Sequence, residues 1–419
     1  MRVFRALSPI LVFLLLYLVT SIILQDFYKV PITVAFLISS IYALAITKGK
    51  LSDNIKIFSK GAGDSNLLLM LWIFIMAGAF ASTAKAMGGI DATVNLALRS
   101  LPSFAILPGL FLASCFISLA IGTSTGTVAA LVPIAWGVSG EMSVDPALVV
   151  GLVVGGAYFG DNLSFISDTT IVATQSQGCK MSDKFRENIR LVAPVAVIML
   201  IVYFILGSGI KEINAPVEVD FLKVIPYIVV IISALCGMNV AAVLMLGLGL
   251  SGVIGMIQGS FDIWGWFSAI QEGITSMSDL IIMTLLAGGM LSIIRHNGGI
   301  KYIIKAMTAK VNGKRGAEMS ISMLVVLVNL CTANNTVTLI TVGPIAKDIS
   351  EKYDIRPRRS ASILDTMSCF TQGLLPYGIQ TLMAVSLTSL TPIDLLSHMY
   401  YPMLIGLAVI VSIVFRRKK

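Results

Sequence analysis

Charged side chains are scarce in this chain: Asp, Glu, Lys and Arg make up only 12% of its 419 residues. Soluble domains carry roughly 25% charged residues, so the composition excludes an ordinary soluble enzyme or binding module. Hydrophobic residues make up 56% of the chain, and the mean hydropathy is +0.90. These values are typical of a protein that crosses a lipid bilayer many times.

Histidine and cysteine are also rare, with two and five residues. No pair of cysteines has a CxxC spacing, and His296 and His398 lie near the ends of apolar segments. A zinc cluster and a disulfide framework are therefore excluded, and no cofactor is expected. The net charge of +8 comes from basic residues scattered among short loops, which fits membrane topology and gives no nucleic-acid surface.

Apolar stretches of spanning length recur near 7–24, 31–47, 66–86, 189–208, 221–237, 240–258, 279–294 and 400–415. Polar residues interrupt four further stretches, 104–139, 145–178, 317–348 and 359–390. We expect an all-α polytopic membrane protein with about ten transmembrane helices. In it, 104–139 and 317–348 form re-entrant hairpins, and 145–178 and 359–390 form broken helices.

Basic residues predict which side of the membrane each loop faces. If the two hairpins enter and leave on one side, the clusters that include Arg2, Lys48, Lys184 and Arg295 share a side with the basic C-terminal tail. The opposite side then carries mainly Asp and Glu. The positive-inside rule therefore places both termini in the cytoplasm, with the chain in the cytoplasmic (inner) membrane of a bacterium.

The two halves of the chain repeat the same motifs in the same order. The stretch 122–135, GTSTGTVAALVPIA, aligns with 333–346, ANNTVTLITVGPIA, and an Asp-x-x-Ser motif follows each copy, at Asp161 and at Asp365. This order predicts an inverted-topology repeat with a substrate site near the membrane midplane. The predicted first half covers 1–206, an outer linker covers 207–220, and the second half covers 221–419.

Two carboxylates interrupt the apolar stretch 155–174, GGAYFGDNLSFISDTTIVAT, at Asp161 and Asp168. An ionised carboxylate costs several kcal/mol at bilayer depth, so these residues are expected to line a cavity inside the protein. With Asp365, they are the candidate ligands for Na⁺, and no Lys or Arg shares their segments at that depth. The simpler interpretation is a polar loop outside the membrane. Gln372 stands in the second copy where Asp168 is expected, which favours Asp161 as the main cation ligand or proton carrier.

Small hydroxyl and amide residues occupy both predicted hairpin tips, at 122–127 and 332–336. Their oxygens and the freed backbone carbonyls suit Na⁺, and the N-termini of the following half-helices suit an anionic group. Alternatively, the hydroxyls only bond to carbonyls of the preceding turn. The candidate ion- and substrate-binding residues are Thr123, Ser124, Thr125, Asp161, Asn162, Ser164, Ser167, Asp168, Thr169, Asn334, Asn335, Thr336, Asp365, Ser368, Thr371 and Gln372.

The stretch GDNLSFISDT at 160–169 resembles the Gly-Asp-x-x-Ser-x-x-Ser-Asp-Thr signature of the NhaC-type Na⁺/H⁺ antiporter family. The stretch DTMSCFTQGLLPYG at 365–378 looks like the second copy in that family. The family is similar to the wider ion transporter superfamily of inverted-repeat secondary carriers. The resemblance implies a cation-coupled secondary transporter.

The sequence therefore predicts a Na⁺/H⁺ antiporter that works by alternating access, with Na⁺ and H⁺ as coupling ions. The alternative is a Na⁺- or H⁺-coupled carrier of an organic anion or amino acid, whose carboxylate the tips would hold. An enzyme is not expected, because an intramembrane aspartyl protease needs Gly-x-Gly-Asp where this chain has YFGD at 158–161. The expected partners are the bilayer and a small cation or organic substrate; a homodimer is compatible with the sequence.

Overall fold

The computed structural model describes residues 2–19, 31–164, 167–210, 219–236, 238–308, 311 and 313–415. All regular secondary structure in these ranges is helical, so the predicted all-α class is confirmed. The predicted linker is described only at its two ends, because 211–218 lie outside the described residues. The basic tail, 416–419, lies outside them as well.

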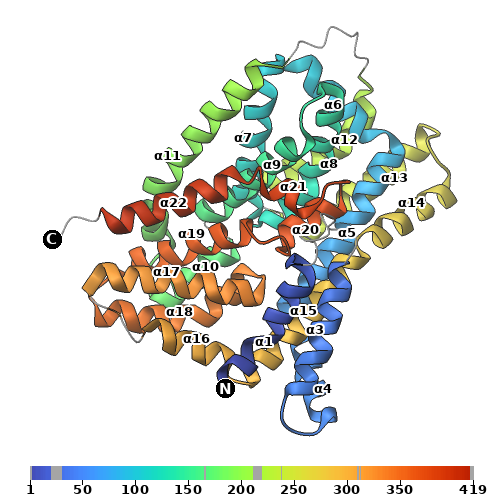
Figure 1. The fold of residues 1–419 in the computed structure, drawn as a ribbon. Helices are drawn as coiled ribbons and strands as arrows, with labels where there is room; N and C mark the ends of the chain where they lie inside the picture. The colour runs from blue at the N-terminus through green and yellow to red at the C-terminus, as the bar shows by residue number, and fades with distance from the viewer. Residues whose placement is uncertain are drawn as a thin grey trace.

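The first half contains α1 (Arg2–Leu14), the π-helix η1 (Leu15–Val19), α3 (Ile32–Ile46), α4 (Leu51–Ala62), α5 (Ser65–Met87), α6 (Gly89–Ser100), α7 (Ser103–Ile121), α8 (Ser124–Met142), α9 (Pro146–Leu163), α10 (Asp168–Gln177) and α11 (Met181–Ser208) (Figure 1). The second half contains α12 (Phe221–Leu235), α13 (Val240–Ile257), α14 (Ile263–Ser276), α15 (Ser278–His296), α16 (Gly299–Thr308), α17 (Gly313–Thr332), α18 (Asn335–Lys352), α19 (Pro357–Gly373), α20 (Ile379–Ser386), α21 (Pro392–Leu396) and α22 (Tyr400–Val414).

Six stretches of the described chain are long and apolar enough to cross a membrane: Leu67–Met87, Pro146–Gln177, Met181–Ser208, Val240–Ile257, Ile263–His296 and Gly313–Thr332. Several shorter apolar helices accompany them, among them Ser103–Leu119 and Tyr400–Val414. These helices fit a multi-pass membrane protein. Because the shorter helices can cross only in part or with support from neighbours, the count of about ten crossings stays a prediction.

Helices of each half pack against helices of the other half, and the contacts in the two directions correspond. Helices α3 and α4 of the first half pack on α15 of the second, while α13 and α14 of the second half pack on α5 of the first. Figure 1 shows the first group in the lower part of the view and the second group on the right. Likewise, α10 packs along α18, and α20 packs on α8. Each half therefore completes the bundle of the other.

Glycines allow the closest of these contacts. A Cβ atom added to Gly78 of α5 would collide with the backbone of Gly273 in α14, and one added to Gly288 of α15 would approach the backbone of Gly61 in α4 too closely. Helices come this near only where small residues face each other. Gly78 and Gly288 hold matching places in the two halves, since each follows an alanine and comes ten residues before a Gly-Gly-Ile sequence, at 88–90 and 298–300. The same close packing therefore recurs in both halves.

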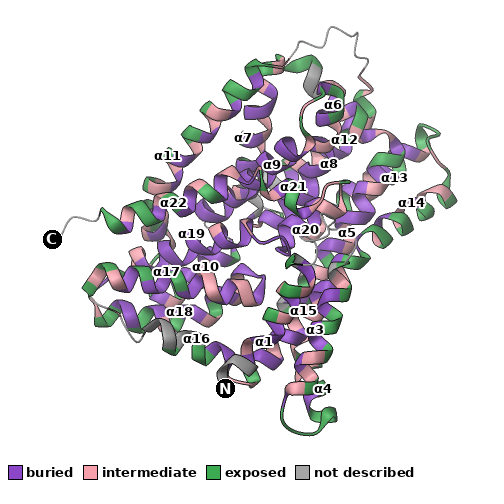
Figure 2. Ribbon diagram, in the orientation of Figure 1, coloured by how far each residue is buried: buried purple, intermediate pink, exposed green. Residues whose placement is uncertain are grey.

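Burial separates the central helices from the outer ones. Helix α9 is buried along almost its whole length, whereas α11 exposes large apolar side chains such as Val197, Ile201 and Ile205 (Figure 2). An exposed apolar face on a spanning helix suits lipid. Helix α9, which carries Asp161, is instead enclosed by protein.

Candidate functional site

The stretch 145–178, predicted as a broken helix, is interrupted between the end of α9 at Leu163 and the start of α10 at Asp168. Side chains bond to the backbone on both sides of this break. The Ser164 hydroxyl donates to the Leu119 carbonyl at 3.1 Å, and the Thr170 hydroxyl donates to the Ser164 carbonyl at 2.8 Å. The Thr170 bond satisfies a backbone carbonyl that lacks a helical partner at the break, and the Ser164 bond ties the break to α7.

The second half has a similar break between α19, which ends at Gly373, and α20, which begins at Ile379. The Gln372 amide donates to the Ala333 carbonyl at 2.8 Å, which ties this break to the end of α17. The backbone N–H of Gly378 bonds to the Leu375 carbonyl at 3.0 Å and closes the turn before α20.

Both predicted tips are sharp turns between consecutive helices. Gly122 joins α7 to α8 with a φ of 75°, and Ala333 joins α17 to α18 with a φ of 48°. Glycine adopts this left-handed region without strain, whereas alanine does not. The second tip is held locally, because the Asn334 side chain accepts from the Val337 backbone N–H at 3.0 Å and caps α18.

The first tip is capped from another helix. The Thr123 side chain makes no cap bond, and the Asp161 carboxylate accepts from the backbone N–H of Ser124 at 3.0 Å instead. Asp161 therefore lies at the N-terminus of α8, where the helix dipole and free N–H groups favour a negative charge. Its side chain is buried.

A small cavity of about 40 Å³ lies where the two tips and the two breaks meet. One water needs roughly 10–15 Å³, so the cavity has room for an ion or a few waters. Carboxylate, hydroxyl and amide groups dominate its wall. The lining residues are Gly122, Thr123, Ser124, Thr125, Asp161, Ser167, Asp168, Thr169, Asn334, Asn335, Thr336, Gln372, Ile379 and Gln380.

Most of the sequence-predicted site residues thus come together at this cavity, from both halves of the chain. Five others are buried but do not line it: Asn162, Ser164, Asp365, Ser368 and Thr371. Ser368 and Thr371 donate to carbonyls of their own helix, the simpler role considered for such hydroxyls. Asp168, the first residue of α10, lines the cavity and is exposed.

The sequence did not predict a buried lysine beside these residues. Lys184 was assigned to the cytoplasmic loop charges, but its side chain is only 1% exposed. Its ammonium lies 2.8 Å from the Asp365 carboxylate and donates to the Asn162 carbonyl at 3.0 Å and the Thr170 hydroxyl at 2.5 Å. Lys184 belongs to α11, outside the two polar stretches that carry the carboxylates, so considering those stretches alone did not reveal it. The turn at Gly178 brings the first turn of α11 into the protein.

A periodic pattern along α11 could have revealed this lysine. Lys184 and Asn188 share a buried face with Val192, Val195 and Met199, at helical spacing. The Asn188 amide donates to the Asp365 carboxylate at 2.9 Å and to the Asn162 carbonyl at 2.7 Å. Asp365 is therefore neutralised by a lysine, whereas no ion pair within the described ranges involves Asp161.

Gln380 is a second residue that sequence reasoning missed. Its amide donates to the Ser124 hydroxyl at 2.9 Å, and its carbonyl accepts from the Gln372 amide at 3.2 Å. Helix α19 continues eight residues past Asp365, whereas α9 ends two residues past Asp161, so α20 begins later relative to its motif than α10 does. A gap-free alignment of the two Asp-x-x-Ser motifs therefore pointed to Gln372 alone.

The three predicted Na⁺ ligands do not form a joint carboxylate cage. In the part of the chain that the structure describes, no group of three or more His, Cys, Asp or Glu side chains is placed to share a metal ion. The small cavity instead combines Asp161 and Asp168 with neutral oxygens. Hydroxyl, amide and backbone oxygens are common Na⁺ ligands at interrupted membrane helices, so this set fits a monovalent cation.

A larger cavity of about 310 Å³ shares two residues of its wall, Asn334 and Ile379, with the small one. It lies against α4, α15 and the tip between α17 and α18, and Lys60, Asp64 and Arg295 contribute its charges. The two cavities are therefore neighbours that share part of one wall.

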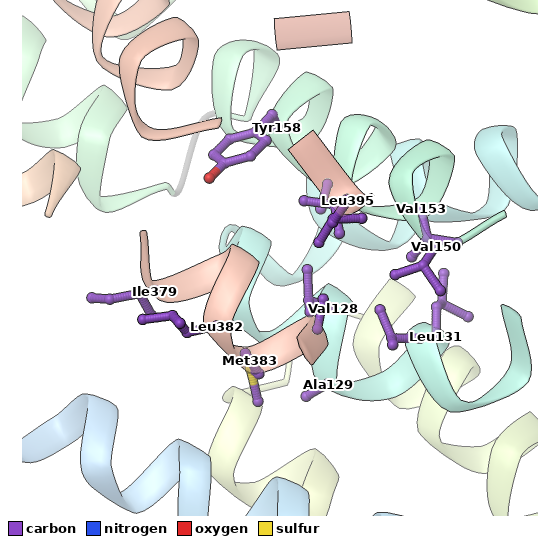
Figure 3. Close-up of a cluster of buried hydrophobic side chains, with 14 of the residues drawn as sticks. Val128, Ala129, Leu131, Val150, Val153, Tyr158, Ile379, Leu382, Met383 and Leu395 are labelled. Carbon is purple, nitrogen blue, oxygen red and sulfur yellow. The ribbon is translucent and has the colours of Figure 1, made fainter. Parts of the chain in front are cut away.

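A third cavity, of about 580 Å³, shares no lining residue with the small one. It borders the later parts of α8 and α20, at Trp136 and Ser386, whereas the small cavity borders the starts of the same helices. Between these ends the two helices pack together, and Figure 3 shows Val128 and Ala129 of α8 and Met383 of α20 within one apolar cluster. The site is therefore closed on this side.

The model of the Na⁺/H⁺ antiporter family matches residues 3–208 and 214–416. The Na(+)/H(+) antiporter NhaC of Alkalihalophilus pseudofirmus is 22% identical over 312 residues, which cover 67% of each chain. The malate-2H(+)/Na(+)-lactate antiporter of Bacillus subtilis is 25% identical over 385 residues, 83% of this chain and 81% of that one. The arginine/ornithine antiporter ArcD of Halobacterium salinarum is 24% identical over 380 residues, 81% of this chain and 77% of that one.

Proposed function

The chain belongs to the Na⁺/H⁺ antiporter family, and we propose that it exchanges Na⁺ for H⁺ at the small cavity lined by Asp161. The observation that carries this proposal is the environment of the Asp161 carboxylate. It is buried, it faces hydroxyl and amide groups from both halves, and no ion pair in the described part of the chain neutralises it. Such a carboxylate takes either a cation or a proton, and alternation between them is exchange.

The residues around Asp161 have different roles in binding the ion. The Ser124 N–H donates to one carboxylate oxygen and orients the ionised group that binds Na⁺. Thr125, Asn335 and Thr336 offer neutral oxygens to the ion. Exposed Asp168 adds a negative charge at the cavity, which raises the local concentration of cations.

Alternating access requires that the site open to each side in turn. The 310 Å³ cavity approaches the site on the side of Lys60 and Arg295, which the positive-inside rule places in the cytoplasm, while α8 and α20 close the other side. We therefore assign this conformation to the cytoplasm-facing state. Opening to the outside separates the packed helices α8 and α20 and closes the approach beside Asn334.

The exchanged packing of the two halves supports an inverted-topology repeat. Helices α10 and α20 each pack on the half-helix of the opposite half, α18 and α8, and the paired glycines repeat the same close contact. On this proposal, the tips at Gly122 and Ala333 belong to re-entrant hairpins that enter from opposite sides. Both termini lie in the cytoplasm of a bacterial cell.

One observation favours the alternative, a Na⁺- or H⁺-coupled exchanger of an organic anion or amino acid. The approach cavity carries two basic residues, Lys60 and Arg295, against one acidic residue, Asp64. A net positive approach disfavours a cation and attracts a carboxylate. Two of the similar antiporters are named for organic substrates, malate and lactate in one and arginine and ornithine in the other.

Proteoliposomes with a pH-sensitive dye distinguish these functions. For the antiporter, added Na⁺ collapses a preformed proton gradient, and Asp161→Asn abolishes the response. Asp53→Asn, an exposed carboxylate change on α4, serves as the control and leaves the response intact. If Na⁺ moves no protons but labelled malate or an amino acid accumulates, the alternative holds. If neither flux appears, both proposals fail.

A further inference from the structure

We propose that the ammonium group of Lys184 is a built-in cation that fills the carboxylate site at Asp365. It thereby leaves Asp161 as the one site for a transported cation. This inference rests on the proposed exchange at Asp161 and goes further, because it fixes how many cations bind at a time.

The surroundings of the ammonium group resemble a cation site. A carboxylate oxygen of Asp365, the backbone carbonyl of Asn162 and the hydroxyl of Thr170 lie 2.8, 3.0 and 2.5 Å from it. An ammonium has three donors, and each finds one oxygen acceptor here. Carboxylate, carbonyl and hydroxyl oxygens are also the groups that coordinate Na⁺ at broken helices.

Two further oxygens beside this site have no hydrogen-bond partner in the described ranges, Oδ1 of Asp365 and Oδ1 of Asn188. The Asn188 amide nitrogen donates to both the Asn162 carbonyl and the Asp365 carboxylate, so the orientation of this amide is fixed. Its oxygen is buried and unbonded. With Lys184 removed, this oxygen and the three acceptors of the ammonium are available to a bare ion.

The matching place beside Asp161 has no lysine. Helix α11 packs on α19 and α9, and α22 packs on the same two helices from the second half. At Asn162, the residue after Asp161, α22 supplies the hydroxyl of Tyr401, which accepts from the Asn162 amide at 2.9 Å. The sequence of α22 contains no Lys or Arg. The two carboxylate sites therefore differ in that only Asp365 has its own cation.

This difference has a direct consequence for coupling. The Asp365–Lys184 pair is neutral and buried, so Na⁺ does not bind to Asp365 during the transport cycle. Only Asp161 changes its occupant. The pair also fixes the backbone beside Asp161, through the bond from Lys184 to the Asn162 carbonyl.

The test counts bound Na⁺ in purified full-length protein, by equilibrium dialysis with ²²Na⁺ at alkaline pH. The wild type binds one Na⁺ per chain. Lys184→Met binds two, because Asp365 loses its cation, and Lys184→Met with Asp365→Asn returns to one. Lys180→Met, which removes an exposed charge at the start of the same helix, is the matched control and binds one.

Each other result contradicts one proposal and not the other. Two Na⁺ in the wild type, or one in folded Lys184→Met, overturns the role of Lys184. No Na⁺ in the wild type overturns the proposed exchange instead. If Lys184→Met does not fold, the proposal is tested with the wild type and with the double variant Lys184→Met, Asp365→Asn. One Na⁺ bound by each supports the role of Lys184, whereas a folded double variant that binds no Na⁺ means that Asp365 holds the transported ion.

Discussion

Asp161 of α9 caps α8 by accepting a hydrogen bond at 3.0 Å from the backbone N–H of Ser124, 37 residues earlier in the chain. The carboxylate that is proposed to exchange Na⁺ for H⁺ is thus bonded to the first turn of the helix that closes the site on one side. A negative charge strengthens this bond, and protonation weakens it. The charge of Asp161 and the position of α8 are therefore coupled.

The first prediction concerns Asp161→Asn. The amide oxygen of asparagine still accepts from the Ser124 N–H, so we expect unfolding stability to change by only about 1 kcal/mol. Na⁺-driven proton flux falls to the level of empty liposomes, because an amide cannot release a proton. Thermal unfolding and dye-monitored flux on the same preparation check both parts. Residual exchange in the folded variant places the transported proton elsewhere.

The second prediction concerns the stability of the buried pair. In Na⁺-free buffer, Lys184→Met leaves Asp365 buried without a cation, which we expect to destabilise the protein by about 3–5 kcal/mol. Lys184→Met with Asp365→Asn removes both charges and recovers most of that loss. The midpoint of thermal unfolding in detergent measures the series.

Exposed Lys180 provides the control for that series, since Lys180→Met changes stability by within about 0.5 kcal/mol. A Lys184→Met variant as stable as the control would mean that the ion pair contributes nothing to the folded state.

The third prediction concerns Gln380, which bonds to Ser124 of α8 and to Gln372 of α19. Gln380→Met keeps the length of the side chain and removes both bonds. Each bond contributes about 1 kcal/mol, so loss of positioning raises the KM for Na⁺ roughly five-fold. Gln271→Met, an exposed change on α14, is the control. An unchanged KM in Gln380→Met shows that the bonds do not order the site.

The fourth prediction concerns Arg295 in the approach cavity. For Na⁺/H⁺ exchange, Arg295→Gln removes a repelling charge, so the Na⁺ response becomes faster at low ionic strength and unchanged at high ionic strength. For organic-anion exchange, the same variant lowers the uptake of labelled malate. Lys85→Gln, in the cavity on the closed side, is the matched comparison. Equal rates in wild type and Arg295→Gln at both ionic strengths exclude an electrostatic role.

Much of the site could be predicted from local sequence. Glycine and small polar residues inside apolar stretches mark places where helices end, and the tips at Gly122 and Ala333 and the break before Asp168 occur there. The repeat then suggested which motifs would meet. Those signals are local or depend on order along the chain, so a single sequence carries them.

The site features that the sequence did not predict depend on how the helices pack in three dimensions. Lys184 follows a glycine turn and looks like a loop charge, and only the path of α11 brings it to Asp365. Gln380 reaches the cavity because α19 continues further past its motif than α9 does, so α20 begins later. Asp168 shares a motif with Asp161 but is exposed, because side-chain depth depends on what covers the start of α10.

The most direct test of the account measures protons released when Na⁺ binds. Purified protein in weakly buffered solution receives Na⁺, and a pH-sensitive dye reports the protons that appear. If Na⁺ and H⁺ compete for Asp161, the wild type releases one proton per Na⁺ bound, and Asp161→Asn releases none. Na⁺ binding without proton release in the wild type, or equal release from Asp161→Asn, would contradict the account.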